Sequence, residues 1–267
     1  MKTAYAALAA SAVLAACASS SGPKPFVPPT PRQSPPLNTS YEEDPVRKRA
    51  RAHTELAAGY FELRNMPVAL EEVQIALKAD PQYGPAHNVA GLIYAELRKD
   101  DLAQQHFQRA LSIDARDPDA NNNYGRFLCD RQREAEALKY FLAALSNPLY
   151  QTPERSYVNA GLCSRRRGDG AAAEQYFLRA LKARPTEPQA LYQLADMSYQ
   201  RRDYAQAKHY LTRLEQLAAP SAEVLWLALR IERRLGERNA AAAYGQQLRR
   251  QFPNSREARA FDAGNEE

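Results

Sequence analysis

The feature that most restricts the fold of this 267-residue chain is an internal repeat of 34 residues. Helical runs end at Pro81, Pro185 and Pro253; the first two prolines are 104 residues apart and the last two are 68 apart, close to three units and equal to two. The repeat tiles the chain as 50–83, 84–117, 118–151, 154–187, 188–221 and 222–255, with two extra residues at 152–153. A period of this length predicts helix pairs that bury their apolar faces only by stacking on neighbouring pairs.

Three places within the unit are restricted in size, as expected where two helices cross closely. The twentieth place is alanine in every unit: Ala69, Ala103, Ala137, Ala173, Ala207 and Ala241. The eighth place is small in five of the six units: Ala57, Gly91, Gly125, Gly161, Ala195 and then Leu229. The twenty-fourth place is large in five units and breaks the rule in the last: Val73, Phe107, Phe141, Phe177, Leu211 and then Gly245.

This combination of period and restricted places resembles the tetratricopeptide repeat. The resemblance implies an all-α fold, a right-handed superhelical solenoid of six tetratricopeptide (TPR) helix-turn-helix repeats over residues 49–255. Residues 256–267 would then form a C-terminal cap that ends in a frayed tail.

The first residues carry a separate signal. Lys2 is followed by an apolar run from Ala4 to Ala16, which is too short to span about 30 Å of hydrocarbon. A charge followed by a short apolar run and small residues is typical of a secretory signal peptide. The sequence from Leu14 to Cys17 resembles the lipobox of bacterial lipoproteins, which implies removal of residues 1–16 and lipidation of Cys17. Ala18 after the cysteine then implies sorting to the periplasmic face of the outer membrane; the alternative is an ordinary signal peptide with a chance cysteine.

The stretch that follows, residues 17–48, is expected to be a tether. Seven prolines lie between Pro23 and Pro36, and each fixes φ and removes a backbone donor. A proline-rich segment of this kind is extended and semi-rigid. It is either a passive spacer or a docking segment for a proline-binding partner.

The two remaining cysteines lie in related contexts. Cys129 is the twelfth residue of unit three and Cys163 the tenth of unit four, both near the end of a first helix. First helices of consecutive units pack side by side, and a periplasmic location permits disulfides. We therefore expect a Cys129–Cys163 disulfide; the alternative is two buried thiols that fill small sites.

Nothing in the sequence indicates catalysis. The four histidines, His53, His87, His106 and His209, do not form an H-E-x-x-H motif, and no phosphate-binding loop or nucleophile motif occurs. The formal net charge of +5 is spread along the chain rather than gathered in a stripe, so nucleic acid is not an expected partner. We expect a protein-binding scaffold and not an enzyme, with no metal, no cofactor and no small-molecule substrate.

A binding groove is expected along the first helices, which line the concave side of such a stack. Phe61 and Leu92 are apolar at places where solvent is expected, and this favours a groove for an amphipathic helix or an extended peptide. The same groove would include Ala58, Ala95 and Asn88. A second candidate surface combines aromatic and arginine side chains of units four to six: Tyr192, Tyr199, Trp226, Arg166 and Arg230. Ordinary packing against a neighbouring helix is the alternative for each of them.

The leader, the tether and the six units together resemble the PilF/PilW pilotin family of type IV pilus biogenesis lipoproteins. The residues that carry the likeness are Leu14–Cys17, the array from 50 to 255, and the segments NNNYGRFLC and NAGLC. The resemblance implies an outer-membrane pilotin that binds secretin subunits and promotes their outer-membrane targeting and multimerisation. The alternative is a scaffold lipoprotein for other cell-envelope machinery, such as peptidoglycan synthesis, division or outer-membrane protein assembly.

Overall fold

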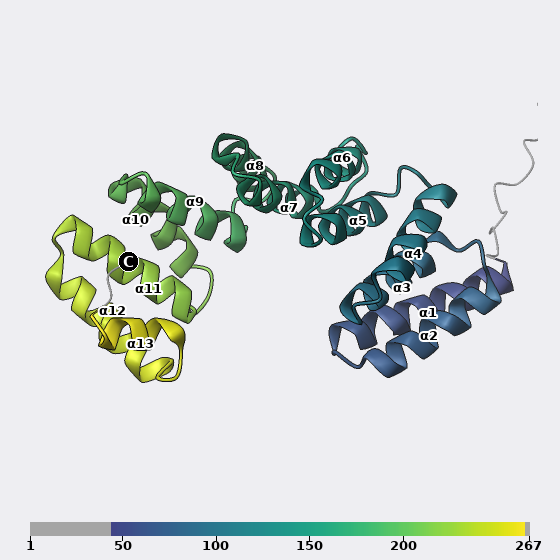
Figure 1. The fold of residues 1–267 in the computed structure, drawn as a ribbon, viewed down its shortest axis with the longest axis horizontal. Coiled ribbons are helices and arrows are strands. Elements are labelled where there is room, and N and C mark those ends of the chain that lie inside the picture. Colours follow the sequence, from purple (N-terminus) through teal and green to yellow (C-terminus); the bar gives the residue numbers. More distant parts are fainter. Residues whose placement is uncertain (1–43, 265–267) are drawn as a thin grey trace, which may run out of the picture. The chain divides into compact units, whose positions relative to one another are not determined.

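The computed structural model describes residues 44–264, which form thirteen α-helices and no strand (Figure 1). The helices are α1 (Pro45–Glu62), α2 (Met66–Ala79), α3 (Gly84–Glu96), α4 (Asp100–Ile113), α5 (Pro118–Asp130), α6 (Glu134–Leu145), α7 (Pro153–Arg166), α8 (Gly170–Ala183), α9 (Pro188–Gln200), α10 (Tyr204–Glu215), α11 (Ala222–Leu235), α12 (Arg238–Gln251) and α13 (Arg256–Asp262). The first twelve form six consecutive pairs, each packed on the next. The prediction of an all-α stack of helix-turn-helix units is confirmed. The leader, most of the tether and Cys17 lie outside the described residues.

Helix α1 begins earlier than the sequence pattern indicates, at Pro45, inside the stretch assigned to the tether. The Asp44 side chain accepts a hydrogen bond of 3.0 Å from the Val46 amide, and proline occupies the first helical position. Both features start a helix, because the aspartate satisfies a free N–H and proline has no N–H to leave unpaired. The first helix of unit one is therefore longer than its equivalents.

Side-chain sizes at places eight and twenty-four are complementary. In units two to four a Cβ on the glycine at place eight would lie within 2.8 Å of the phenylalanine at place twenty-four, as for Gly91 and Phe107 at 2.7 Å. Only glycine lets the helices approach this far. Unit six exchanges the sizes, with the buried Leu229 at place eight and Gly245 at place twenty-four. All six alanines at place twenty are buried, as the pattern predicts.

The turn inside each unit has one constant backbone feature. Place fifteen adopts a left-handed conformation in all six units, at Arg64, Arg98, Gln132, Gly168, Arg202 and Gly236, with φ between 58° and 85°. A side chain at such a φ is strained, so glycine in units four and six is the relaxed solution. The same φ in the four other units shows that stacking, and not local preference, sets this turn.

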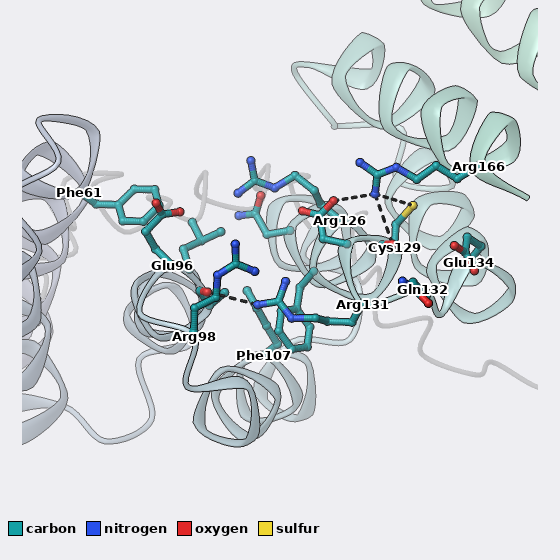
Figure 2. A pocket seen from close by; sticks show the side chains of 15 residues that line it. Phe61, Glu96, Arg98, Phe107, Arg126, Cys129, Arg131, Gln132, Glu134 and Arg166 are labelled. Carbon is teal, nitrogen blue, oxygen red and sulfur yellow. Dashed lines mark hydrogen bonds and ion pairs between the residues drawn. The ribbon is translucent and has the colours of Figure 1, made fainter.

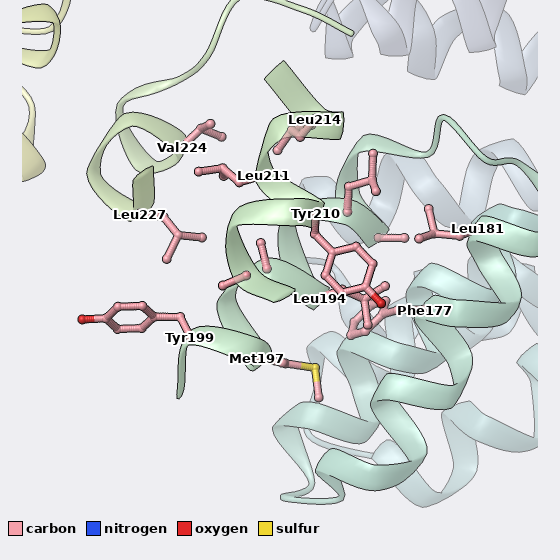
Figure 3. Close-up of a cluster of buried hydrophobic side chains, with 14 of the residues drawn as sticks. Phe177, Leu181, Leu194, Met197, Tyr199, Tyr210, Leu211, Leu214, Val224 and Leu227 are labelled. Atoms are coloured by element: carbon pink, nitrogen blue, oxygen red, sulfur yellow. The ribbon is translucent and has the colours of Figure 1, made fainter. Parts of the chain in front are cut away.

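The apolar core of the described residues follows the helix pairs as four clusters of buried side chains. Figure 3 shows the cluster formed by units four to six, where Phe177 and Leu194 lie among side chains from α8, α9, α10 and α11. At the C-terminal end α13 covers α11 and α12. Its Phe261 ring occupies the space that a side chain at Gly245 would need, and the guanidinium of Arg249 lies 4.6 Å from the ring centre. Among residues 44–264, no helix has the length and apolar character needed to cross a membrane.

Candidate functional site

Two adjoining pockets lie along the first helices of units one to four. They share Phe61, Leu92, Asn123 and Arg126, and their volumes are about 530 and 410 Å³. We call the two pockets together the first-helix groove. Figure 2 shows the larger one, with Phe61 at one side and Arg166 at the other.

The repeat brings these side chains together. Helices α1, α3 and α5 contribute Ala58, Leu92 and Arg126 from place nine of their units. Place twelve of the same units contributes Phe61, Ala95 and Cys129. Equivalent places of stacked helices lie next to each other, so one row of residues per place runs along the groove.

The structure brings four of the five predicted groove residues to this surface. Phe61 and Leu92 line both pockets, Ala95 lines the larger one and Ala58 the smaller one. Asn88 is instead buried beneath the groove, with 8% of its surface exposed. It is a structural side chain that accepts a hydrogen bond, and it does not line either pocket.

An asparagine network forms the floor of the groove. The Asn123 Nδ2 donates to Asn88 Oδ1 at 3.2 Å, which links α5 to α3. The buried Asn122 Oδ1 accepts from Asn159 Nδ2 and from the Ser156 hydroxyl, each at 2.9 Å, which links α5 to α7. Buried amides with these partners fix the helices in one register.

Some arginine side chains of the groove form ion pairs with carboxylates, and others do not. The Arg166 guanidinium donates to Asp130 at 2.8 Å and to the Cys129 carbonyl at 3.3 Å. Arg131 pairs with both carboxylate oxygens of Asp100 at 2.6 Å, and this pairing lowers the pKa of that carboxyl. Arg126 is exposed, and within the described part of the chain no ion pair links it to a carboxylate. The groove therefore offers three exposed guanidinium groups, Arg98, Arg126 and Arg155, that no ion pair of residues 44–264 links to a carboxylate, and Arg126 is the one that lines both pockets with Phe61 and Leu92.

The two cysteines meet behind this groove. The sulfurs of Cys129 and Cys163 lie at disulfide distance, with Cα atoms 5.9 Å apart, which is the usual separation for a bridge. Both residues are buried. The pair joins α5 to α7 and so spans the boundary where the chain carries its two extra residues.

The second predicted surface does not form one site. Tyr192 lines a separate small pocket beside Pro188 and Leu214. Tyr199 is buried beneath the Arg230 guanidinium, which lies 4.4 Å from its ring centre.

The other two members of that surface also lie apart. Trp226 packs in the cluster at the C-terminal end, and Arg166 belongs to the first-helix groove. Ordinary packing accounts for Tyr199 and Trp226.

The groove residues that were not anticipated from the sequence include Arg126, Arg155 and Val158. The signal was available, because they occupy places nine, two and five of units three and four, the same places that identify the groove in units one and two. Extending the place rule to unit three would have found Arg126, and extending it across residues 152–153 would have found Arg155 and Val158.

The arrangement supports binding of another chain. Apolar side chains, exposed amides and a free cation can take an amphipathic segment that also carries an acidic group. In residues 44–264 no three histidine, cysteine or carboxylate side chains cluster in a way that could hold a metal ion.

Comparison with known proteins gives the family. The tetratricopeptide repeat model matches residues 54–120, 101–155, 135–188 and 165–205. The type IV pilus assembly protein PilF of Pseudomonas aeruginosa is 35% identical over 113 residues. That match covers 42% of this chain, and the chain spans 45% of the length of this curated relative.

Solved structures extend the likeness. The structure of Pseudomonas aeruginosa PilF matches with a TM-score of 0.76 at 30% identity and covers 83% of this chain and 100% of that one. The structure of PilW, described as a widely conserved type IV pilus biogenesis factor, matches with a TM-score of 0.72 at 36% identity, covering 79% of this chain and 97% of the other.

Proposed function

Because this chain belongs to the tetratricopeptide repeat family and is homologous to the type IV pilus biogenesis factors PilF and PilW, we propose that it is a pilotin. In this role it is a lipoprotein at the periplasmic face of the outer membrane. It binds secretin subunits of the type IV pilus channel and promotes their targeting to that membrane and their multimerisation. It acts as a binding scaffold and not as an enzyme.

The observation that carries the proposal is the first-helix groove. It places the apolar Phe61 and Leu92 beside the exposed Arg126, which no ion pair within residues 44–264 links to a carboxylate. Burying the two apolar side chains under a partner removes them from water, at about 25 cal/mol per Å² of apolar surface. An acidic group of a secretin segment would pair with Arg126 at the rim.

The mechanism rests on effective concentration. Lipid on Cys17 would hold the chain at the membrane, and three acyl chains with about 0.8 kcal/mol per buried methylene form a lasting anchor. Residues 18–43 would connect this anchor to α1. A secretin subunit held in the groove would then meet other subunits at the membrane at a raised local concentration.

The groove is tested by matched substitutions. Phe61→Ala with Leu92→Ala should weaken secretin binding at least tenfold, because hot-spot apolar contacts each contribute about 1–2 kcal/mol or more. Arg126→Glu should weaken binding without removing any packing. The control is Leu142→Ala with Leu178→Ala, two exposed leucines on α6 and α8 outside the groove. Undiminished binding in the groove variants, measured by surface plasmon resonance with the secretin periplasmic region, would place the site elsewhere.

The cellular role is tested by deleting the gene. Loss of the heat-resistant secretin multimer on a gel, restored by the wild-type gene and not by the Phe61→Ala/Leu92→Ala gene, is the expected result. Normal multimers in the outer membrane after deletion would instead favour a scaffold role in other envelope machinery.

The anchor and the disulfide have their own tests. Mass spectrometry of the N-terminal peptide should find acyl groups on Cys17, and Cys17→Ser should move the protein out of the membrane fraction. We also propose that Cys129 and Cys163 form a disulfide in the cell. Alkylation of the protein unfolded in denaturant without reductant should then modify neither of them; two alkylated thiols would contradict the bridge.

A further inference from the structure

A pair of histidines in unit two, His87 and His106, has no place in the binding groove. His87 lies on α3 and His106 on α4, and their Nδ1 atoms are 3.0 Å apart. Both rings are half-buried. They occupy places four and twenty-three of the repeat, which face each other across the helix pair.

The same two places carry a related pair only in unit one. There His53 Nδ1 lies 2.6 Å from Glu72 Oε2. From unit three onward place twenty-three is a tyrosine: Tyr140, Tyr176, Tyr210 and Tyr244. Paired imidazoles are therefore a special feature of unit two and are not required by the stack.

The hydrogen bonds fix how the protons are arranged on His87. Its Nε2 faces the Pro81 carbonyl oxygen at 3.1 Å, and a carbonyl only accepts, so Nε2 carries the proton. In the neutral ring the Nδ1 atom then has a free lone pair, and it is this atom that faces His106. An imidazole whose far nitrogen donates to a backbone carbonyl is the arrangement that orients histidine ligands at metal sites.

The surroundings of both rings favour the neutral imidazole over the charged one. Burial lowers the pKa of His87, and the charge of Arg109 lowers it further. Burial also lowers the pKa of His106, with a smaller effect from His87. The Tyr94 ring stacks on His106 with a centroid distance of 5.2 Å and fixes its plane. Neutral imidazoles are the ligand form, whereas the charge of Arg109 sets a limit on how tightly a cation binds.

From this geometry we infer that His87 and His106 form a two-histidine binding site for a divalent transition metal ion, with Cu²⁺ as the best fit. Two nitrogens bound to one metal at about 2.0–2.1 Å lie about 2.9 Å apart at a right angle and about 3.4 Å apart at a tetrahedral angle. The observed 3.0 Å matches the right angle that Cu²⁺ prefers.

Binding needs only a local rearrangement. The proton that His106 shares with His87 moves from Nδ1 to Nε2 of His106 through solvent, and both rings turn so that their Nδ1 lone pairs point away from each other and toward the ion at one side of the Nδ1–Nδ1 line. Water completes the coordination, since no third histidine, cysteine or carboxylate of residues 44–264 joins the pair.

The test uses Cu²⁺ alone and the full chain with Cys17→Ser, which removes the thiol of that residue, purified without a polyhistidine tag. Calorimetry in a weakly coordinating buffer at pH 7.5 should give one Cu²⁺ per chain, and pulsed electron paramagnetic resonance should count two imidazole nitrogens. His87→Asn and His106→Asn should each weaken binding at least tenfold, since even loss of an outer contact costs this much at metal sites. His53→Gln and His209→Asn are the matched controls and should bind as the parent chain does.

The nitrogen count needs no variant and so stays informative even if a substitution disturbs folding, which circular dichroism would reveal. Fewer than two imidazoles in the spectrum, or unchanged binding in both His87→Asn and His106→Asn, would overturn the assignment. So would loss of the site in His53→Gln alone.

Discussion

The two ends of the described array are built differently. At the C-terminal end α13 covers the last pair, and Phe261 lies over Gly245 between the guanidinium groups of Arg249 and Arg233. At the N-terminal end Leu56 of α1 and Leu63, the residue that follows this helix, are exposed, at 48% and 76% of their surface. The first and last repeats of a stack each have one face with no neighbouring repeat. If that face is apolar, it needs a covering segment, because it is otherwise left in water. Within residues 44–264 only one end carries such a helix.

The units near the two ends also differ in the side chains that face each other between their two helices. In units one and two a histidine at place four, His53 or His87, is hydrogen-bonded to the side chain at place twenty-three, and place twenty-three of units three to six is tyrosine instead. The two helices of each N-terminal unit thus contact each other through an imidazole, whereas those of the later units carry a tyrosine at the facing place. Stability should respond differently to mutation and to pH in the two regions.

The largest expected effect is at the covered end. Phe261→Ala should destabilise it by about 2–3 kcal/mol, less than the roughly 3–5 kcal/mol of a fully buried phenylalanine, because the ring is half-buried. Hydrogen exchange should show α12 and α13 losing protection while α1 and α2 keep theirs, since repeats interact mainly with their neighbours. Equal loss of protection in α1 would show that the array unfolds as one unit.

Gly245→Ala should have the next largest effect, a destabilisation of about 1–2 kcal/mol. The new Cβ would collide with the Phe261 ring, and the cost of overpacking exceeds the roughly 1 kcal/mol that alanine gains over glycine in a helix. Urea unfolding measures the change. In a Phe261→Ala background the same substitution should become neutral or stabilising; an unchanged cost there would show that Phe261 is not the obstacle.

Lowering the pH should weaken the N-terminal units by a smaller amount. The pKa of His87 and of His106 is lowered in the folded protein, so the unfolded chain, with pKa near 6.5, takes up protons first. The free energy of unfolding therefore falls as the pH decreases from about 6.5 to the lowered folded pKa, and is level above that window. His87→Asn with His106→Asn should flatten this slope. An identical pH profile in the double variant would contradict the assignment.

The smallest effect has the opposite sign. Gly59→Ala, in the open face of α1, should stabilise the chain by about 0.5–1 kcal/mol, because a Cβ at Gly59 meets nothing within 4 Å and alanine has the higher helix propensity. Urea unfolding of Gly59→Ala beside Gly245→Ala compares one chemical change at the two ends. Destabilisation by Gly59→Ala would show that another surface covers this face of α1.

Much of the fold could be predicted from the sequence because its restrictions repeat. Alanine at place twenty recurs in all six units and glycine at place eight in units two to four, so the copies reinforce one signal. The positions of Phe61 and Leu92 in the groove could also be predicted, because they occupy places of the repeat that face the concave side. Single events were harder to predict. Gly245 could not be understood without Phe261, which follows the last unit and belongs to no repeat.

The histidine pair shows a second limit of the sequence. His87 and His106 are 19 residues apart, and a search for ligand spacings along one helix cannot find them. They meet because places four and twenty-three face each other across the helix pair. Asn88 likewise occupies a groove place, and its burial depends on the amide of Asn123, one unit later.

The complementary sizes at places eight and twenty-four have a consequence for how such an array can change through recombination. Units two, three and four each place a phenylalanine against a glycine. Recombination between the gene segments that encode these three units therefore preserves the contact, and it adds or removes whole units. The last unit is not exchangeable in this way. Joining its first helix to the second helix of unit three would set Leu229 against Phe141, and the reciprocal product would set Gly125 against Gly245 and leave a void. The two helices of unit six must therefore be inherited together.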